Sequence, residues 1–421
     1  MVERTIFPNG LRLITIPHRD AKTVTVFLLV GTGSKYEPKE LNGVSHFVEH
    51  MLFKGTKKRP SALHVAEVLD RVGGSYNAFT GEDSTGYYAK VDAAHFHLAL
   101  EWVSDIVLHS LLPALEIEKE KGVVSEEINM YRDNPASHVQ SVWTRLLYGD
   151  QPAGRDIAGT KESVNSFTRD QLLGYWTAQY GAANTVIAIA GPVTKKECEE
   201  AVWKLFGAMN THMPLGKPPV NDSQERCAVS LEFRKTDQTH LAVGGRGFPL
   251  FSSKRYIQGV LATVLGGMMS SRLFTNIRED LGLAYYVSTS SDADPDTGSV
   301  VTFAGVKNAE AARAVREIVK EYRAMAEHLL SPSELKKAKD NLWGRLVLSL
   351  ESSDAQAGFY ATQELIEGRV FGLDEVYDTI QAVRASDVRE VAKTVFQSAH
   401  LNLALVGPFT DTAAFETVLS A

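Results

Sequence analysis

Two histidines four residues apart, with a carboxylate between them, are the residues of this chain best suited to chemistry. They are His46 and His50, and Glu49 lies between them. On a helix, residues four apart share one face, so both imidazoles can bind one zinc ion. Glu49 then flanks the metal, where it can act as a general base toward water. The order H-x-x-E-H therefore predicts metal-assisted hydrolysis, with a peptide bond as the expected target.

The segment around these three residues is expected to form a helix that begins at a cap at Asn42 and ends by Gly55. Apolar residues recur along it at the spacing of one helix face, and the ionisable residues form a second stripe beside them. A buried helix with three ionisable groups is costly unless they have partners, and a metal ion would partner all of them. The alternative, core histidines with a surface glutamate, is the usual explanation of a lone histidine but fits this pattern poorly.

A catalytic zinc needs a third protein ligand, and residues 114–133 offer one. This segment has a helical pattern that ends before Asn134-Pro135, where the proline disfavours further helix. Glu127 shares a half-buried stripe with Glu120, whereas Glu126 lies on a solvated face. We therefore predict Glu127 as the third ligand and Glu120 as a carboxylate that orients a metal-binding side chain. The remaining glutamates are expected on the solvated face: Glu116, Glu118 and Glu126.

The chain resembles the pitrilysin family of zinc peptidases, which includes insulin-degrading enzyme and the mitochondrial processing peptidase. In that family a glutamate ligand follows H-x-x-E-H by about 77 residues, and His50 to Glu127 is 77 positions (127 − 50). The family also has a glutamate seven residues before that ligand, matched by Glu120. Two further segments resemble the family's pattern: Met51-Leu52-Phe53-Lys54-Gly55-Thr56 and Gly73-Gly74-Ser75-Tyr76-Asn77-Ala78-Phe79-Thr80.

The resemblance covers essentially the whole chain and implies roles for further residues. Arg278 and Tyr285 match an arginine and a tyrosine that contact substrate in relatives, with Tyr285 also expected to stabilise the oxyanion. Asn77, Ala78 and Phe79 match an edge strand to which an extended peptide adds. One zinc ion per chain is implied. The implied activity is a zinc endopeptidase that hydrolyses unfolded peptides or precursor segments inside a clam-shell chamber.

The second half of the chain repeats the first. Residues 185–192 are echoed by residues 401–408, each a buried strand that ends in Gly-Pro, at an offset of 216 (407 − 191). We predict a catalytic domain over 1–212, a linker over 213–226 and a homologous domain over 227–421. The expected fold class is α+β, with helices packed on mostly antiparallel sheets, and the resemblance implies the LuxS/processing-peptidase metallohydrolase type.

The second half is expected to bind substrate without a metal. Residues 259–269 should correspond to the zinc helix, and they contain neither histidine nor carboxylate. Because one chain carries both the metal motif and the Arg278/Tyr285 pair, a homodimer is predicted, with a heterodimer with a metal-free partner as the alternative.

Composition narrows the class of protein. The chain has 421 residues, 44% hydrophobic and 23% charged, with net charge −7 and no basic block, so nucleic acid is not an expected partner. Cys198 and Cys227 form no disulfide framework, which is typical of a reducing compartment. No apolar run is long enough to span a membrane. A cytoplasmic location is predicted, and a targeting segment removed beforehand is the open alternative.

Two rival functions stay open at this point. The first is a non-catalytic scaffold or binding subunit of the same fold, but such subunits usually lose residues equivalent to Glu49 and Glu127. The second is a protein with a structural zinc ion and no peptidase activity. A structural zinc site needs a fourth protein ligand, and the sequence offers no good candidate.

Overall fold

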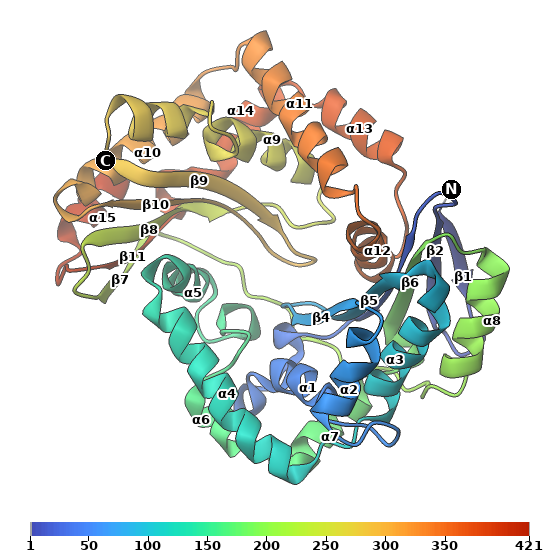
Figure 1. The fold of residues 1–421 in the computed structure, drawn as a ribbon. Helices are drawn as coiled ribbons and strands as arrows, with labels where there is room; N and C mark the ends of the chain where they lie inside the picture. Colours follow the sequence, from blue (N-terminus) through green and yellow to red (C-terminus); the bar gives the residue numbers. More distant parts are fainter. Residues whose placement is uncertain (1, 421) are drawn as a thin grey trace. The chain divides into compact units, whose positions relative to one another are not determined.

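The structure is a computed structural model that describes residues 2–420. The chain forms two compact units, and each is built on its own sheet (Figure 1). Unit 1 contains the described residues up to 129, residues 156–218 and residues 348–370. Unit 2 contains residues 130–155, residues 219–347 and the described residues from 371 onward.

The sheet of unit 1 has six strands in the order β1-β2-β6-β3-β5-β4. The strands are β1 Glu3–Ile6, β2 Arg12–Pro17, β3 Thr23–Val30, β4 Ser75–Thr80, β5 Thr85–Asp92 and β6 Thr185–Gly191. Every pair is antiparallel except β2 with β6. Strand β4 lies at one edge, where β5 is its neighbour.

The sheet of unit 2 has five strands in the order β7-β11-β8-β10-β9. The strands are β7 Ala228–Phe233, β8 Gln238–Arg246, β9 Ala284–Ala293, β10 Gly298–Lys307 and β11 Leu401–Gly407. Again one pair, β7 with β11, is parallel and the others are antiparallel. The two echoed segments are β6 and β11, and each has one parallel and one antiparallel neighbour. The predicted α+β class with two similar, mostly antiparallel sheets is therefore confirmed.

Helices cover the sheets. Those of unit 1 are α1 Val44–Leu52, α2 Ala62–Asp70, α3 Phe96–His109, α6 Lys161–Ser166, α7 Arg169–Gln179, α8 Lys195–Phe206 and α12 Ser353–Thr362. Those of unit 2 are α5 Pro135–Tyr148, α9 Arg255–Gly266, α10 Ala311–Glu327, α13 Leu373–Ala382, α14 Ala385–Val395 and α15 Ala413–Ser420. Two more, α4 Ala114–Asp133 and α11 Pro332–Ser349, include residues of both units.

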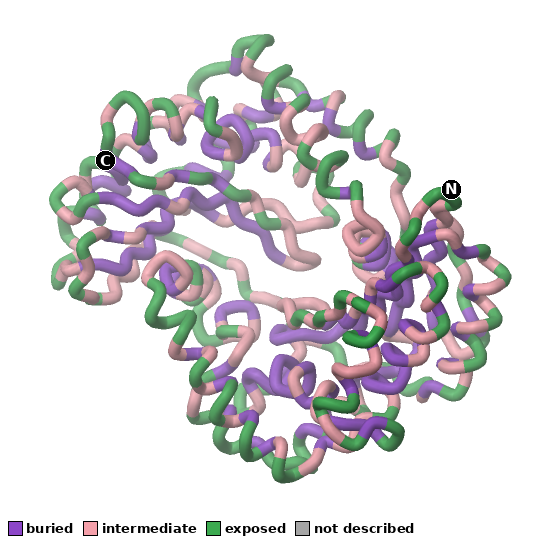
Figure 2. The backbone as a smooth tube through the Cα atoms, in the orientation of Figure 1, coloured by how far each residue is buried: buried purple, intermediate pink, exposed green. Residues whose placement is uncertain are grey.

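The central strands are buried on both faces (Figure 2), and this requires a cover on each face. In β6 all seven residues are buried: Ile187 and Ile189 join one apolar cluster, while Val186 and Ala188 join another. A continuous apolar strand needs helices on both sides, because side chains alternate between the faces.

The second cover of each sheet comes from the other half of the sequence. Helix α12 packs on β3 and β6 of unit 1, and α5 packs on β8 and β11 of unit 2. Tyr360 of α12 and Trp143 of α5 are buried in these contacts. The predicted boundaries, 1–212 and 227–421, follow chain order. In the structure, residues 130–155 with α5 belong to unit 2, and residues 348–370 with α12 belong to unit 1.

Residues 210–224 form neither helix nor strand and lie where the linker was predicted. Of the helices in residues 2–420, none is both long and apolar enough to cross a membrane.

Candidate metal centre

Helix α1 supplies both histidines of the motif. Its apolar residues are fully buried in the core of unit 1, which anchors the helix: Val44, Phe47, Val48, Met51 and Leu52. His46 and Glu49 lie on the neighbouring stripe, and each is 9% exposed. The helix therefore holds its ionisable groups at the margin of the core, as the sequence pattern predicted.

The start of α1 differs from the prediction of a cap at Asn42. The capping residue is Gly43, whose φ of 93° favours glycine, and it offers no side chain to the helix. Glu37 supplies the missing acceptor, because its carboxylate accepts hydrogen bonds from the backbone N–H groups of Gly43 and Ser45, each at 2.7 Å. The amide of Asn42 donates to the same carboxylate at 3.1 Å. A carboxylate outside the helix thus satisfies the helix N-terminus and suits its dipole.

Burial dominates the electrostatics of Glu37. It raises the pKa of this carboxyl to about 7, although the hydrogen bonds to the carboxylate lower it. A hydroxyl chain adjoins it, in which the Tyr175 hydroxyl is 2.7 Å from the Ser45 hydroxyl and 2.8 Å from that of Thr32. The turn that precedes His46 is therefore held by polar groups of several elements.

The three predicted metal ligands meet within unit 1. The Nε2 atoms of His46 and His50 are 3.2 Å apart, and each is 3.6 Å from Oε2 of Glu127. Ligand atoms at roughly 2.0–2.1 Å from a tetrahedral zinc lie about 3.3 Å from one another, so these distances fit one zinc ion. Glu126 instead accepts a hydrogen bond from Asn129 on the exposed face of α4.

The three ligand atoms of His46, His50 and Glu127 lie so close together that a cation between them would be stabilising. Glu120 accepts a hydrogen bond from Nδ1 of His50 at 2.8 Å, which leaves Nε2 of a neutral His50 as a lone-pair donor. A carboxylate oxygen and two imidazole nitrogens at 3.2–3.6 Å repel one another unless a proton or metal lies between them. The chemistry of this donor set is the one that zinc prefers.

Burial and neighbouring charges shift the pKa values of the two cluster histidines in opposite directions. Burial first, and then the neighbouring His50, lowers the pKa of His46 to about 3, so its imidazole is neutral near pH 7. Burial would raise the pKa of Glu120, but its bonds to His50 and Lys54 outweigh this and lower it. The Lys54 ammonium lies 2.5 Å from the second oxygen of Glu120. Burial lowers the pKa of His50, but Glu120, Glu49 and Glu127 outweigh it and raise that pKa.

Glu49 lies beside the cluster with its carboxylate held on one side. The Thr80 hydroxyl donates a hydrogen bond to Oε2 of Glu49 at 2.5 Å. Burial raises the pKa of Glu49, and the bond from Thr80 partly opposes that effect. A raised pKa makes this carboxylate a stronger proton acceptor than an exposed one.

The predicted peptide-binding residues Asn77, Ala78 and Phe79 lie on the edge strand β4. Asn77 and Phe79 are exposed on one face, whereas Ala78 packs toward the core of unit 1 on the other. Within residues 2–420, no strand pairs with the outer edge of β4. Its backbone groups are thus arranged as an extended peptide would need them.

Arg278 and Tyr285 belong to unit 2. Arg278 lies in a π-helical turn, Phe274–Asp280, with its guanidinium over the Phe274 ring at 4.7 Å. Tyr285 is on the edge strand β9 and is 76% exposed. Both side chains are available to a ligand, and neither belongs to the metal cluster of unit 1.

Three residues that shape the site were missed by sequence reasoning: Glu37, Lys54 and Thr80. Lys54 and Thr80 occur within the family-like segments, yet a linear pattern does not reveal which carboxylate each contacts. Glu37 precedes the motif by nine positions (46 − 37) and carries no periodic signal.

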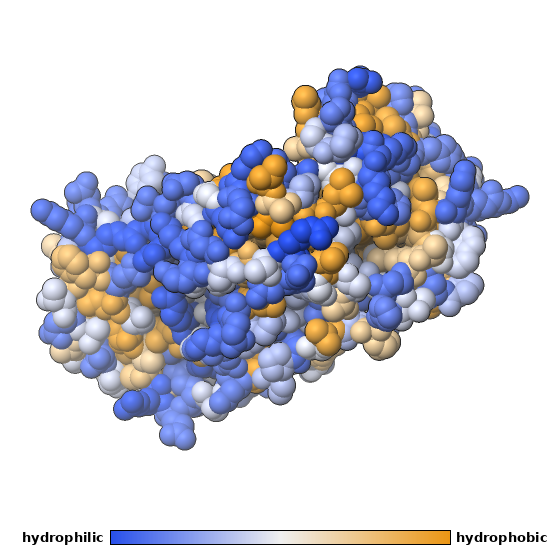
Figure 3. Space-filling view, turned by 90° about the horizontal axis from the view of Figure 1, so that it is seen from below, coloured by the Kyte–Doolittle hydropathy of each residue, from blue (hydrophilic) through white to orange (hydrophobic). Residues whose placement is uncertain are grey.

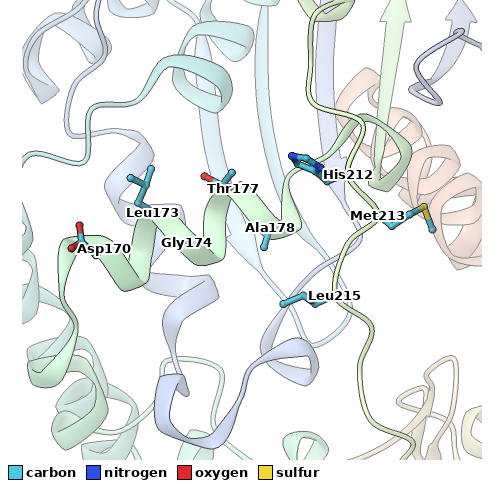
Figure 4. A pocket seen from close by; sticks show the side chains of 8 residues that line it. All are labelled: Asp170, Leu173, Gly174, Thr177, Ala178, His212, Met213 and Leu215. Atoms are coloured by element: carbon cyan, nitrogen blue, oxygen red, sulfur yellow. The ribbon is translucent and has the colours of Figure 1, made fainter.

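A shallow hollow of about 680 Å³ lies elsewhere in unit 1 (Figure 4). Leu173 and Thr177 of α7 line it together with Met213 and Leu215 of residues 210–224, and it contains none of the predicted site residues. On the face seen in Figure 3, hydrophilic residues surround scattered hydrophobic groups, as is ordinary for protein surfaces. Neither feature competes with the metal cluster as a candidate for chemistry.

Comparisons with known proteins show which family the chain is similar to. A family model described as insulinase (peptidase family M16) matches residues 12–161, and one described as the peptidase M16 inactive domain matches residues 166–342. A Bacillus subtilis protein named an uncharacterized zinc protease is 36% identical over 410 residues, covering 97% of this chain and 98% of that protein. A Streptomyces coelicolor protein of the same description is 34% identical over 421 residues, covering 98% and 91%. The crystal structure of a protease from Helicobacter pylori has the same fold, with a TM-score of 0.91 at 22% identity and coverage of 97% and 99%.

Proposed function

This chain belongs to peptidase family M16, as its motifs predicted, and on that premise we propose that it is a zinc-dependent endopeptidase. The observation that carries the proposal is the cluster of His46, His50 and Glu127 beside the buried carboxylate of Glu49. Three protein ligands leave one zinc position for water or substrate, which is the arrangement of catalytic sites. The proposed substrates are unfolded peptides or precursor segments.

His46, His50 and Glu127 would hold one zinc ion, and Glu120 would keep the His50 ring in its orientation. When bound, zinc supplies a Lewis acid that polarises the scissile carbonyl and lowers the pKa of a water molecule. Glu49 accepts the proton of the attacking water and passes it to the leaving amine. The raised pKa of Glu49 favours the first of these transfers, because it makes the carboxylate a stronger proton acceptor.

Substrate recognition is proposed to use the backbone more than the side chains. An extended peptide would add to the outer edge of β4 through main-chain hydrogen bonds at Asn77, Ala78 and Phe79. Arg278 is proposed to contact a substrate carbonyl, and Tyr285 to donate to the oxyanion. Their exposure in unit 2 supports availability for these roles. The enclosed chamber expected from the resemblance stays a prediction.

The test is digestion of a mixture of unstructured peptides, read by mass spectrometry, with wild type and Glu49→Gln in parallel. Wild type with zinc should cleave, while Glu49→Gln should bind the same amount of zinc and lose activity by roughly 10²- to 10⁴-fold. The Gln side chain has nearly the same shape and cannot accept the proton. Equal cleavage by both proteins would refute the role of Glu49.

The same experiment decides between the proposal and its rivals. Zinc-loaded wild type that cleaves nothing would favour a non-catalytic scaffold or binding subunit. A structural zinc site would need a fourth protein ligand, and within residues 2–420 the cluster contains only His46, His50 and Glu127. The geometry therefore favours the catalytic reading.

We propose further that the protein is a homodimer, because one chain carries both the metal residues and the Arg278/Tyr285 pair. Light scattering coupled to size-exclusion chromatography tests this assembly. A monomer that gains activity with a second, metal-free chain would instead support the heterodimer. A cytoplasmic location is proposed separately, because Cys198 and Cys227 are free thiols, as is typical of a reducing compartment.

A further inference from the structure

Thr80 is the residue whose contact gives the proposed general base a defined orientation. It is the last residue of β4, and its side chain points to the same side of the sheet as Tyr76 and Ala78. That side packs against the core of unit 1, and β4 contacts α1 there. The strand thus delivers the Thr80 hydroxyl to Oε2 of Glu49 at 2.5 Å.

This hydrogen bond has no substitute in the surrounding protein. In residues 2–420 no other hydrogen bond reaches the Glu49 carboxylate, which is 9% exposed at the residue level. A buried carboxylate with a single donor depends strongly on that donor for its side-chain orientation. The bond occupies one acceptor site of Oε2, so Oε1 keeps its full capacity to accept a proton.

We propose that Thr80 is a positioning residue for the peptidase reaction: its hydroxyl holds Oε2 of Glu49 and thereby directs Oε1 toward the attacking water. This inference rests on the proposed function and adds a residue to which no role had been given. Thr80 also ends the edge strand proposed to pair with substrate. The strand that aligns the peptide and the group that orients the base are therefore one rigid element.

The kinetic test compares two variants with the wild type. Thr80→Val keeps the branched shape that suits a strand and removes the hydroxyl, whereas Thr80→Ser keeps the hydroxyl and removes the methyl group. The expected result is a fall in kcat of roughly 10- to 100-fold for Thr80→Val, with KM and zinc affinity nearly unchanged. Thr80→Ser should recover most of kcat. Equal kcat in Thr80→Val and wild type, or equal loss in both variants, would overturn the proposal.

A second readout does not depend on activity. In the metal-free protein at alkaline pH, the infrared carboxylate band of Glu49 is identified by its loss in Glu49→Gln. That band should shift in Thr80→Val and return in Thr80→Ser, because only the latter can donate to Oε2. An unmoved band in Thr80→Val would refute the hydrogen bond. If wild type cleaves no peptide, the proposed function fails, and the infrared result still decides whether Thr80 holds Glu49.

Discussion

Helices α1 and α9 occupy equivalent places in the two units, yet they bury different kinds of side chain. Helix α1 lies between strand β3 and the edge strand β4 in the chain, and α9 lies between β8 and the edge strand β9. Both pack into the main apolar core of their unit. The shared topology shows that the apolar face of each helix is what the fold requires.

The polar residues of the two helices find different partners. Gln258 of α9 is fully buried, and its amide bonds to the backbone N–H of Phe248, the Ser291 hydroxyl and the Asp292 carbonyl. Protein groups therefore satisfy it completely. The Nε2 atoms of His46 and His50 instead face each other and Glu127, an arrangement that a cation stabilises. The comparison teaches that the fold tolerates either solution, and that α1 rather than α9 carries candidate metal ligands.

The largest expected effect comes from removing the ligand that α4 brings to α1. Glu127→Gln should weaken zinc binding by more than about 10²-fold, since even residues that only orient a ligand cost roughly 10- to 100-fold. Peptide cleavage should fall with it. Competition with a chromophoric chelator measures the affinity.

Glu126→Gln is the matched control for this change, because Glu126 is the adjacent carboxylate on the exposed face of the same helix. It should leave zinc affinity and cleavage within about twofold of wild type, in the range of neutral surface changes. Similar losses of zinc affinity in both variants would show that α4 contributes negative charge rather than a metal ligand. The proposed difference between α1, beside a metal site, and α9 would then be unsupported.

A smaller effect is expected from unit 2, where Tyr285→Phe tests whether that unit takes part in the reaction. Loss of a donor to the oxyanion should lower kcat by roughly 10²-fold with little change in KM, because the bond forms in the transition state. Steady-state kinetics on one cleaved peptide measures both constants. Unchanged kcat would restrict unit 2 to binding or structure.

The smallest effect on activity, and a distinct effect on stability, is expected at Glu37. In the folded protein the pKa of Glu37 is about 7, above the ordinary value of 4.5. Between pH 4.5 and pH 7, Glu37 is therefore protonated in the folded protein and ionised in the unfolded protein. Its contribution to stability is complete below about pH 4.5 and is lost as pH rises through 7, a change on the order of 3 kcal/mol. The capping residue of helix α9 is Lys254, whose side chain makes no capping hydrogen bond.

Hydrogen exchange of the α1 amides in metal-free wild type and Glu37→Gln measures this effect, with the two proteins compared at each pH. The advantage of wild type should be larger at pH 5 than at pH 8. A constant difference across this range would show that the pKa of Glu37 is the same in the folded and unfolded protein.

The sequence was most informative where the structure is local. The spacing of His46 and His50 places both imidazoles on one helix face, and periodicity along residues 114–133 separates Glu127 from Glu126 on α4. The bounds of α4, Ala114–Asp133, match the prediction, because the proline at 135 disfavours the continuation of the helix. The repeated strands β6 and β11 were likewise visible as two similar, mostly apolar runs that end in Gly-Pro.

Tertiary structure decided the contacts between distant segments. The cap predicted at Asn42 was wrong because Glu37 folds back onto the N–H groups of α1, and a carboxylate satisfies them better than a nearby amide. The apolar runs of β6 and β11 required a second cover, but either half of the chain had helices that could supply it. In the folded chain α12 covers β3 and β6, and α5 covers β8 and β11, so each sheet takes its second cover from the other half of the sequence.

In the candidate site, too, some features follow from local sequence and others only from tertiary packing. The sequence by itself determined which residues can bind zinc and which carboxylate lies beside them, because helix geometry relates spacing to direction. Only the folded chain brought Glu120 to His50 and Thr80 to Glu49. Those bonds join residues separated by 70 and 31 positions, and no local periodicity relates such residues until the sheet and helices have packed.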